Sequence, residues 1–229
     1  MTSIHADLTG SLGARIAAGD IAPGTILTLA RLEADYEASR TAVRETVRVL
    51  ETMGMVASRR RVGITVQPRE EWDAFSPLLI RWNLDGPFRR QQLESLMEVR
   101  VAVEPTAARL AAVRASSTQR AELRRLAARL RALGDRHLGA SPAFLDTDVA
   151  FHAELLRASG NLQLAGLSDP VGEVLRGRSR LGLTPEVPAE GTLEQHELVA
   201  AAIARGDADA AEELSRGHMR QVWTEIHVD

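Results

Sequence analysis

Apolar residues recur at every third or fourth position along most of this chain, a period that predicts helices rather than strands. A first helix fits residues 8–18, and the glycines and proline of residues 19–24 end it. A second helix fits residues 29–38. A third follows Ser39, a residue type that commonly caps helix N-termini, and ends at Gly54. The apolar faces of these helices are Leu8, Leu12 and Ile16, then Leu29, Leu32 and Tyr36, then Val43, Val47 and Leu50.

The pattern changes after the third helix. Two short stretches rich in β-branched residues, MVAS and VGITVQ, flank three consecutive arginines, which predicts a β-hairpin with a basic tip. Three helices followed by a hairpin are the layout of a winged helix-turn-helix. In that fold the third helix enters the major groove of DNA, and the hairpin lies against the DNA backbone or minor groove.

Beyond Val66 the pattern is helical almost throughout, and no stretch reads convincingly as a strand. We therefore expect a mainly α protein in three parts. Residues 1–68 form a winged helix-turn-helix DNA-binding domain, residues 69–86 form a linker with a short helix, and residues 87–229 form an all-helical antiparallel bundle.

Composition narrows the class of protein. The chain has 229 residues, 45% of them apolar, and no cysteine, which excludes disulfides and thiolate metal sites. It contains no apolar run of transmembrane length and no secretory signal pattern at its N-terminus. We therefore expect a cytoplasmic protein that does not associate with membranes.

Basic charge is concentrated in one place. The formal net charge is -3, yet residues 39–63 hold six arginines and only two acids. Arg40, Arg44 and Arg48 lie at i, i+4 and i+8, so they form a stripe along the third helix. Such a local basic surface is typical of a phosphate-binding site. The alternative is a solvated face on which Arg44 or Arg48 pairs with Glu45 or Glu51.

Other residues near the stripe also suit DNA. Ser39 and Thr41 stand at the start of the third helix, where hydroxyls and exposed backbone N–H groups bind phosphates. Arg60 and Arg61 lie at the expected hairpin tip, and Gly63 would let the hairpin approach DNA closely.

The stretch SRTAVRETVRVLETMGMV resembles the recognition-helix signature of the GntR family of bacterial transcription regulators. The turn IAPGTIL and the hairpin segment RVGITV are similar to that family as well, and the resemblance covers about residues 8–66. It implies that Arg40, Thr41, Arg44 and Gly63 contact operator DNA, with Ser39 and Arg48 as further candidates.

One feature departs from the family pattern. Many members carry a charged run in the second helix, where an arginine contacts DNA. Here the stretch is TLARLEADY, with Ala30 at the place of that arginine and Arg31 beside it. Neighbouring helical positions differ by about 100° around the axis. Arg31 is therefore a candidate that faces a different direction.

Histidines of the expected bundle are candidate metal ligands. Asp148 and His152 are four residues apart and share one helix face, while His196 and His218 lie on the last two helices. A bundle can bring such faces together around a central cavity. Three imidazoles and a carboxylate suit Zn, Ni, Mn or Fe. From the spacing alone, a hydrogen-bonded surface pair and separately buried core histidines are the more common arrangements.

The bundle segments ESLMEVRVAVEPTAARLAA, DVAFHAELLRASGN and EQHELVAAIARGD are similar to the FCD domain, the effector-binding domain of FadR-type GntR regulators. The resemblance covers about residues 90–222. It implies that Asp148, His152, His196 and His218 bind a divalent metal ion, with Zn as the first choice and Ni, Mn or Fe as others.

Two further residues are effector-binding candidates. The family places an arginine near the pocket at the position of Arg100, where a guanidinium could hold a carboxylate ligand in a bidentate manner. An ion pair with Glu104, four residues later, is the alternative for Arg100. Asn161 is either a pocket contact or a helix cap.

These observations predict a homodimeric transcription regulator, not an enzyme, that binds a short palindromic operator in double-stranded DNA. The hypothesis is a repressor that a small organic acid, such as a sugar acid, releases from DNA. Three alternatives stay open: a metal sensor in which the ion is the signal, a metal-dependent enzyme, and a bundle whose metal is only structural.

Overall fold

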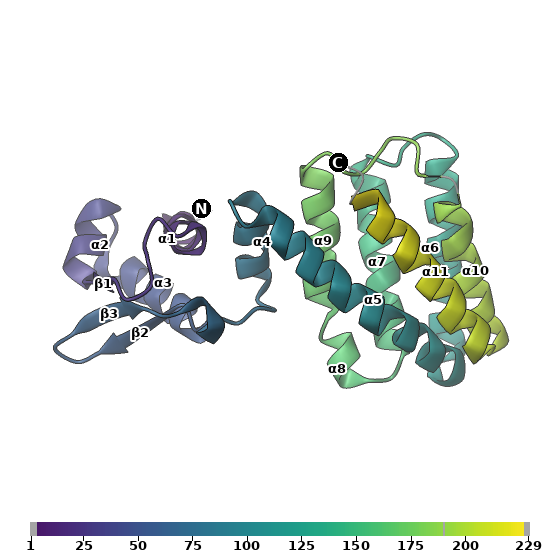
Figure 1. Cartoon of the computed structure of the whole chain (residues 1–229), viewed down its shortest axis with the longest axis horizontal. Coiled ribbons are helices and arrows are strands. Elements are labelled where there is room, and N and C mark those ends of the chain that lie inside the picture. Colours follow the sequence, from purple (N-terminus) through teal and green to yellow (C-terminus); the bar gives the residue numbers. More distant parts are fainter. Residues whose placement is uncertain (1–3, 190, 227–229) are drawn as a thin grey trace. The chain divides into compact units, whose positions relative to one another are not determined.

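The computed structural model describes residues 4–189 and 191–226, which form two compact units, one up to residue 92 and one from residue 93 (Figure 1). The first unit is the expected winged helix-turn-helix. It contains α1 (Ile4–Ala18), β1 (Ile26–Leu27), α2 (Leu29–Asp35), α3 (Arg40–Thr52), β2 (Val56–Arg59), β3 (Gly63–Val66), the 3-10 helix η1 (Arg69–Glu71) and α4 (Pro77–Asp85).

The third helix has the boundaries that its sequence predicts. The Ser39 hydroxyl accepts a hydrogen bond from the backbone N–H of Ala42 at 3.2 Å and so caps α3. Gly54, with a φ of 70°, reverses the chain after the helix. The apolar stripe of α3 packs against α1, and Val43 and Leu50 are fully buried between the helices and the sheet.

Three details differ from the expectation, the first being that α1 begins at Ile4 rather than at residue 8. A third strand, β1, pairs antiparallel with β3, Ile26 opposite Thr65 and Leu27 opposite Ile64, so the sheet order is β1-β3-β2. The second helix ends at Asp35 rather than at residue 38, because Glu37 adopts a φ of 49°, which a right-handed helix does not allow. The strand β1 was missed because its two residues are too few to show the alternation of apolar and polar positions by which strands are recognised.

Helix α4 packs on α1 and so completes the first unit. The indole of Trp82 lies directly over Gly13, where any β-carbon would come within 2.1 Å of the ring. Gly13 therefore allows α1 and α4 to approach closely.

The second unit is helical throughout the residues that the structure describes, as expected. It contains α5 (Arg89–Arg114, from residue 93 onward), α6 (Ser117–Gly134), α7 (Pro142–Ala158), α8 (Leu162–Ala165), α9 (Ser168–Arg180), α10 (Thr192–Arg205) and α11 (Ala208–Ile226). Helix α10 packs between α11 and α6, and α7 packs between α6 and α9. Small buried residues of α5, among them Ala107 and Ala111, pack against this layer. None of the described helices is both long and apolar enough to cross a lipid bilayer.

Arg120 joins the ends of two helices in this unit. Its guanidinium donates to four backbone carbonyls at 2.8–3.1 Å. These are the carbonyls of Ala112 in the last turn of α5, of Ala115 just after that helix, and of Ile203 and Ala204 at the end of α10. These carbonyls belong to the groups that a helix cannot satisfy internally.

We expect Arg120→Met to destabilise the second unit by about 2–4 kcal/mol, since four partly buried hydrogen bonds are lost and their acceptors remain. Urea unfolding followed by circular dichroism measures the change. Arg129→Met, on the exposed face of α6, is the matched control and should change stability by less than about 0.5 kcal/mol. Equal stability of the two variants would contradict the capping role of Arg120.

Candidate metal centre and nucleic-acid interface

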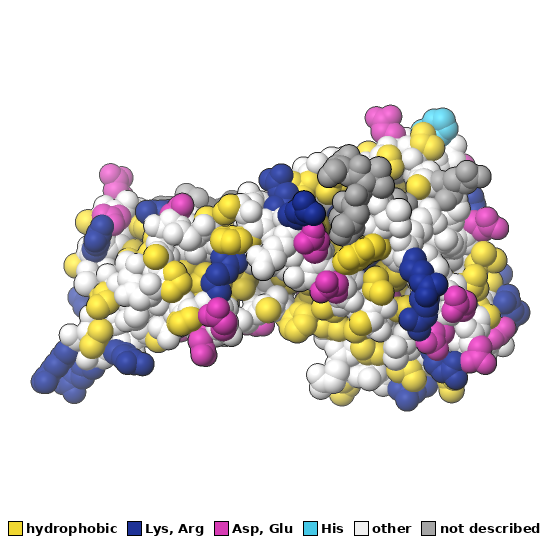
Figure 2. Space-filling view, in the orientation of Figure 1, with side chains coloured by type: hydrophobic (Ala, Val, Ile, Leu, Met, Phe, Trp, Pro, Cys, Tyr) yellow, Lys and Arg dark blue, Asp and Glu magenta, His cyan; other side chains and the backbone are white. Residues whose placement is uncertain are grey.

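The basic stripe of α3 is exposed, and the β2–β3 hairpin lies beside it. Arg44, Arg48, Arg59 and Arg60 line a groove between the helix and the hairpin. Basic side chains gather at the end of the hairpin, which Figure 2 shows as a dark blue cluster. Ser39 and Thr41 are both exposed at the start of α3. Helix and hairpin thus present their charges to one groove.

Some of these arginines have acidic neighbours. Arg48 Nη1 lies 2.7 Å from Glu45 Oε1, Arg31 Nε lies 3.4 Å from Asp35 Oδ2, and Arg40 Nε lies 4.0 Å from Glu33 Oε1. The ion pairing considered for the stripe therefore occurs at Arg48. Exposed ion pairs of this kind contribute little to stability, so a DNA phosphate can replace the carboxylate partner at little cost. Within the described residues Arg44, Arg59, Arg60 and Arg61 form no ion pair.

Glu51 connects α3 to the hairpin, a role that the sequence did not suggest. Its Oε1 accepts a hydrogen bond of 2.8 Å from the backbone N–H of Ser58 on β2. The bond joins β2, close to the hairpin tip, to the last turn of α3. Glu51 therefore positions the hairpin arginines relative to the helix.

Gly63 has a structural reason in addition to the one expected for DNA. Its φ is +115°, and a β-carbon there would lie 2.8 Å from the carbonyl oxygen of Leu27 on β1. The glycine therefore lets β1 pair with β3 at the base of the hairpin.

We expect Gly63→Ala to destabilise the first unit by about 1–3 kcal/mol, through backbone strain and the clash with β1. Gly10→Ala on α1, whose β-carbon meets nothing within 4 Å, is the matched control and should stabilise slightly. Trp72 and Trp82 both lie in the first unit, so tryptophan fluorescence in a Trp223→Phe background follows its unfolding. A destabilisation of equal size in both variants would contradict the role of β1.

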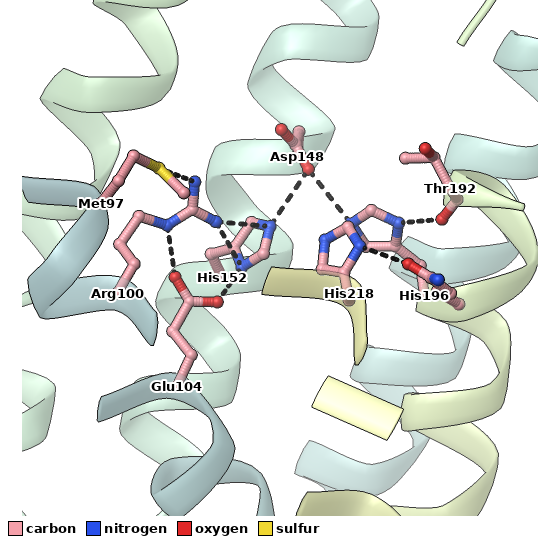
Figure 3. A network of polar contacts seen from close by, with 9 residues as sticks. Met97, Arg100, Glu104, Asp148, His152, Thr192, His196 and His218 are labelled. Carbon is pink, nitrogen blue, oxygen red and sulfur yellow. Dashed lines mark hydrogen bonds and ion pairs between the residues drawn. The ribbon is translucent and has the colours of Figure 1, made fainter. Parts of the chain in front are cut away.

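The candidate metal ligands come together in the second unit. Asp148 and His152 lie on α7, His196 on α10 and His218 on α11 (Figure 3). One nitrogen from each of the three imidazoles lies within 4.8 Å of the others, and the three residues are only 2–5% exposed. Neither a surface pair nor three separate core histidines describes this arrangement.

Each imidazole is held through Nδ1 by a different hydrogen-bond acceptor. His152 Nδ1 lies 2.7 Å from Glu104 Oε2, His196 Nδ1 lies 2.8 Å from the Thr192 carbonyl oxygen, and His218 Nδ1 lies 3.0 Å from Gln195 Oε1. Acceptors at Nδ1 leave Nε2 of each ring as the lone-pair nitrogen. This arrangement, in which the second ring nitrogen is anchored, is typical of metal-binding histidines.

The donor set fits a divalent metal ion. Asp148 Oδ1 lies 3.4 Å from His152 Nε2 and 3.3 Å from His196 Nε2, so the carboxylate faces the same space as the imidazoles. His196 Nε2 is buried and has no hydrogen-bond partner among the described residues. An orphaned buried nitrogen is costly unless a ligand satisfies it. Three imidazole nitrogens and one carboxylate suit Zn and neighbouring transition metals, without selecting one of them.

The charged groups around the site shift one another's pKa values. Burial alone would raise the pKa of Glu104, but Arg100 and His152 outweigh burial and lower that pKa to about 2. Burial likewise opposes ionisation of Asp148, yet the neighbouring imidazoles of His152 and His196 hold its pKa well below the usual value. Burial, and then the neighbouring histidines, lower the pKa of His218 well below the usual value. This shift favours the neutral imidazole, which is the form that binds metal ions.

Arg100 lines the same cavity, and it also forms the ion pair that was its alternative role. Its Nε lies 2.5 Å from Glu104 Oε1, and its Nη2 lies 3.3 Å from both ring nitrogens of His152. Asn161 caps α8, accepting from the backbone N–H of Gln163 at 2.9 Å, and it is not among the residues that line the cavity.

The cavity beside the histidines has a volume of about 60 Å³. Its wall includes Arg178 of α9, which sequence reasoning did not single out, and residues of the loop between α9 and α10, namely Thr184, Pro185, Pro188 and Ala189. This loop is held at the Glu186 carbonyl by the backbone N–H of Gly139, at 2.8 Å. A basic group and a closing loop therefore adjoin the candidate metal centre.

Comparisons with known proteins agree with this architecture. Residues 6–66 match the family model of the bacterial regulatory proteins of the gntR family, and residues 95–221 match the model of the FCD domain. The chain belongs to the GntR family, as a member with an FCD domain. This is a family of DNA-binding transcription regulators, not of enzymes. Both resemblances that the sequence indicated, to the GntR family and to the FCD domain, are confirmed.

Relatives of this GntR-family chain include two Escherichia coli proteins. It is 30% identical over 205 residues to the uncharacterized HTH-type transcriptional regulator YieP, covering 89% of this chain and 87% of YieP. It is also 30% identical over 210 residues to the galactonate operon transcriptional repressor, covering 90% of this chain and 89% of the repressor.

Among solved structures, Lar of Listeria monocytogenes matches with a TM-score of 0.60 at 14% identity, over 99% of this chain and 98% of that one. The GntR protein of Streptococcus agalactiae matches with a TM-score of 0.51 at 22% identity, over 95% of this chain and 98% of that one. At these identities the likeness concerns the fold.

Proposed function

We propose that this GntR-family regulator binds a palindromic operator as a homodimer and leaves it when a small organic acid binds beside a divalent metal ion. The observation that carries the proposal is the convergence of three anchored, buried imidazoles and Asp148 on one cavity. Zn is the ion we expect there.

The DNA-binding part of the proposal rests on the groove between α3 and the hairpin. Arg44, Arg48, Arg60 and Arg61 are exposed, as are the hydroxyl residues at the start of α3. Arg31 is exposed on α2 and is a further candidate. Two copies related by a two-fold axis would place one recognition helix in each half-site of a palindrome. Affinity should fall steeply with salt, because phosphate contacts release counterions.

The effector part rests on the chemistry of the cavity. A metal ion supplies a Lewis-acidic contact for a carboxylate, and Arg100 and Arg178 are the cationic side chains of the wall. Similarity to a galactonate operon repressor favours a sugar acid. A cavity of about 60 Å³ holds only a handful of water-sized groups. A sugar acid would therefore require the loop between α9 and α10 to move outward.

The hypothesis for release is a population shift. A ligand changes DNA affinity only if it binds one arrangement of the dimer better than another. We propose that the acid favours an arrangement whose two recognition helices do not match both half-sites.

The proposal is tested by incubating the protein with genomic DNA fragments from its source and sequencing the retained fragments. Enrichment of one short palindrome is expected. Fluorescence anisotropy on that sequence then compares metal-loaded and chelated protein, each with and without sugar acids and shorter hydroxy acids. Release by an acid only in the metal-loaded protein would support the proposal. A change on chelation alone would identify a metal sensor instead. An unchanged acid response after chelation, with a lower melting temperature, would make the metal structural.

A further inference from the structure

A permanent positive charge lies unusually close to one of the candidate metal ligands. The Arg100 side chain is 1% exposed, and its Nη2 is 3.3 Å from both ring nitrogens of His152. A guanidinium does not lose its proton in proteins. A divalent cation bound at His152 would therefore be repelled by Arg100, and burial would strengthen that repulsion.

Glu104 contacts both the guanidinium of Arg100 and the imidazole of His152. It follows Arg100 by one turn of α5 and is fully buried. Its Oε1 is 2.5 Å from Arg100 Nε, and its Oε2 is 2.7 Å from His152 Nδ1. Figure 3 shows the carboxylate joining the guanidinium to the imidazole. One side chain thus contacts both the cation and the ligand.

The other two histidines show what orientation alone requires. His196 is held by a backbone carbonyl and His218 by the side-chain amide of Gln195, both of them neutral acceptors. Only His152 has a charged acceptor at Nδ1, and of the three imidazoles only His152 has a hydrogen-bond contact with an arginine. Since a neutral acceptor suffices to orient the other rings, the charge of Glu104 must serve a further purpose.

We infer that Glu104 is a positioning residue whose negative charge neutralises Arg100 and so permits a divalent cation to bind at His152, His196 and His218. The inference rests on the metal site of the proposed function. It adds that Arg100 and Glu104, which contact His152 from behind, act as a neutral pair. This pair holds His152 without adding positive charge to the site.

The test uses the full chain with Co²⁺ and Zn²⁺ as probes. Glu104→Gln keeps an acceptor for His152 but removes the charge, and we expect metal affinity to fall roughly 10- to 100-fold, the range typical for changes behind a ligand. The double variant Arg100→Met with Glu104→Gln removes both charges and should regain most of that affinity. The absorption spectrum of bound Co²⁺ should remain similar in all proteins, since the ligands are unchanged.

A matched control separates charge from orientation. Gln195→Met removes the acceptor of His218 without changing any charge, and adding Arg100→Met together with Glu104→Gln should not restore whatever affinity it loses, because that pair of changes leaves the net charge of the site unaltered. Melting temperatures without metal show whether each variant folds, and the double variant leaves no unpaired buried charge.

Three results would overturn the inference. Glu104→Gln that binds metal like the unaltered protein would show that the charge is not needed. A double variant as weak as Glu104→Gln would limit Glu104 to orienting His152. Absence of metal binding by the unaltered protein would overturn the metal site itself, and the role of Glu104 with it.

Discussion

Replacing His196 with glutamine is expected to weaken Zn²⁺ binding by more than about 100-fold, because loss of a partner behind a ligand already costs roughly 10- to 100-fold. His196 is the ligand whose Nε2 is buried without a hydrogen-bond partner among the described residues. Its Nε2 lies 3.3 Å from Asp148 Oδ1, and its ring centroid lies 4.3 Å from that of His218. Competition with a chromophoric chelator measures the dissociation constant, and the metal-induced rise in melting temperature should disappear in parallel.

The control is His137→Asn, at an exposed position with a φ of 58° that asparagine also adopts. It removes a histidine without touching the cluster and should bind Zn²⁺ like the unaltered protein. Wild-type affinity in His196→Gln, or a large loss in His137→Asn, would place the metal elsewhere.

Arg44→Ala is expected to weaken operator binding by about 1–3 kcal/mol, which is roughly 5- to 150-fold in Kd. Arg44 is exposed in the middle of the stripe on α3, lines the groove beside the hairpin, and forms no ion pair within the described residues. No internal contact therefore has to be given up before Arg44 reaches a base or a phosphate. Anisotropy titrations at several salt concentrations measure both the affinity and the number of phosphate contacts.

Arg129→Ala makes the same charge change on the exposed face of α6 and serves as the control. It should leave both Kd and its salt dependence unchanged. If Arg44→Ala lowers the affinity for all DNA sequences equally and reduces the salt dependence of Kd, Arg44 contacts a phosphate rather than a base. No change in either quantity would remove α3 from the interface.

The helices of the first unit could be predicted because each has one buried face at regular spacing. Leu12, Ile16, Val43 and Leu50 carry that signal, and all four are at most 1% exposed. The short strand β1 could not be predicted, since two residues show no period. The early end of α2 depends on the backbone conformation of Glu37, a residue type that gives no warning of a left-handed turn.

The candidate metal centre could likewise be predicted from the sequence only in part. The Asp148/His152 pair is visible as a local spacing, whereas convergence with His196 and His218 depends on how α7, α10 and α11 pack. The spacing of Arg100 and Glu104 suggested an ion pair but not that His152 shares it. The contacts made by Gln195 and Glu51 have no sequence signature, because both join elements whose separation only the fold determines.

Thr192 belongs to the cavity wall and to the metal centre at once. It is the first residue of α10, directly after the loop that lines the cavity. Its carbonyl oxygen contacts His196 Nδ1, and its hydroxyl accepts a hydrogen bond from the side-chain amide of Gln221 on α11. Any displacement of the loop that moves Thr192 therefore changes the support of a metal ligand. Thermodynamic linkage makes this effect mutual: bound metal changes the affinity for the acid by the same factor as bound acid changes the affinity for the metal. The regulator would then respond to the product of two concentrations, and scarcity of either ligand would keep it on its operator.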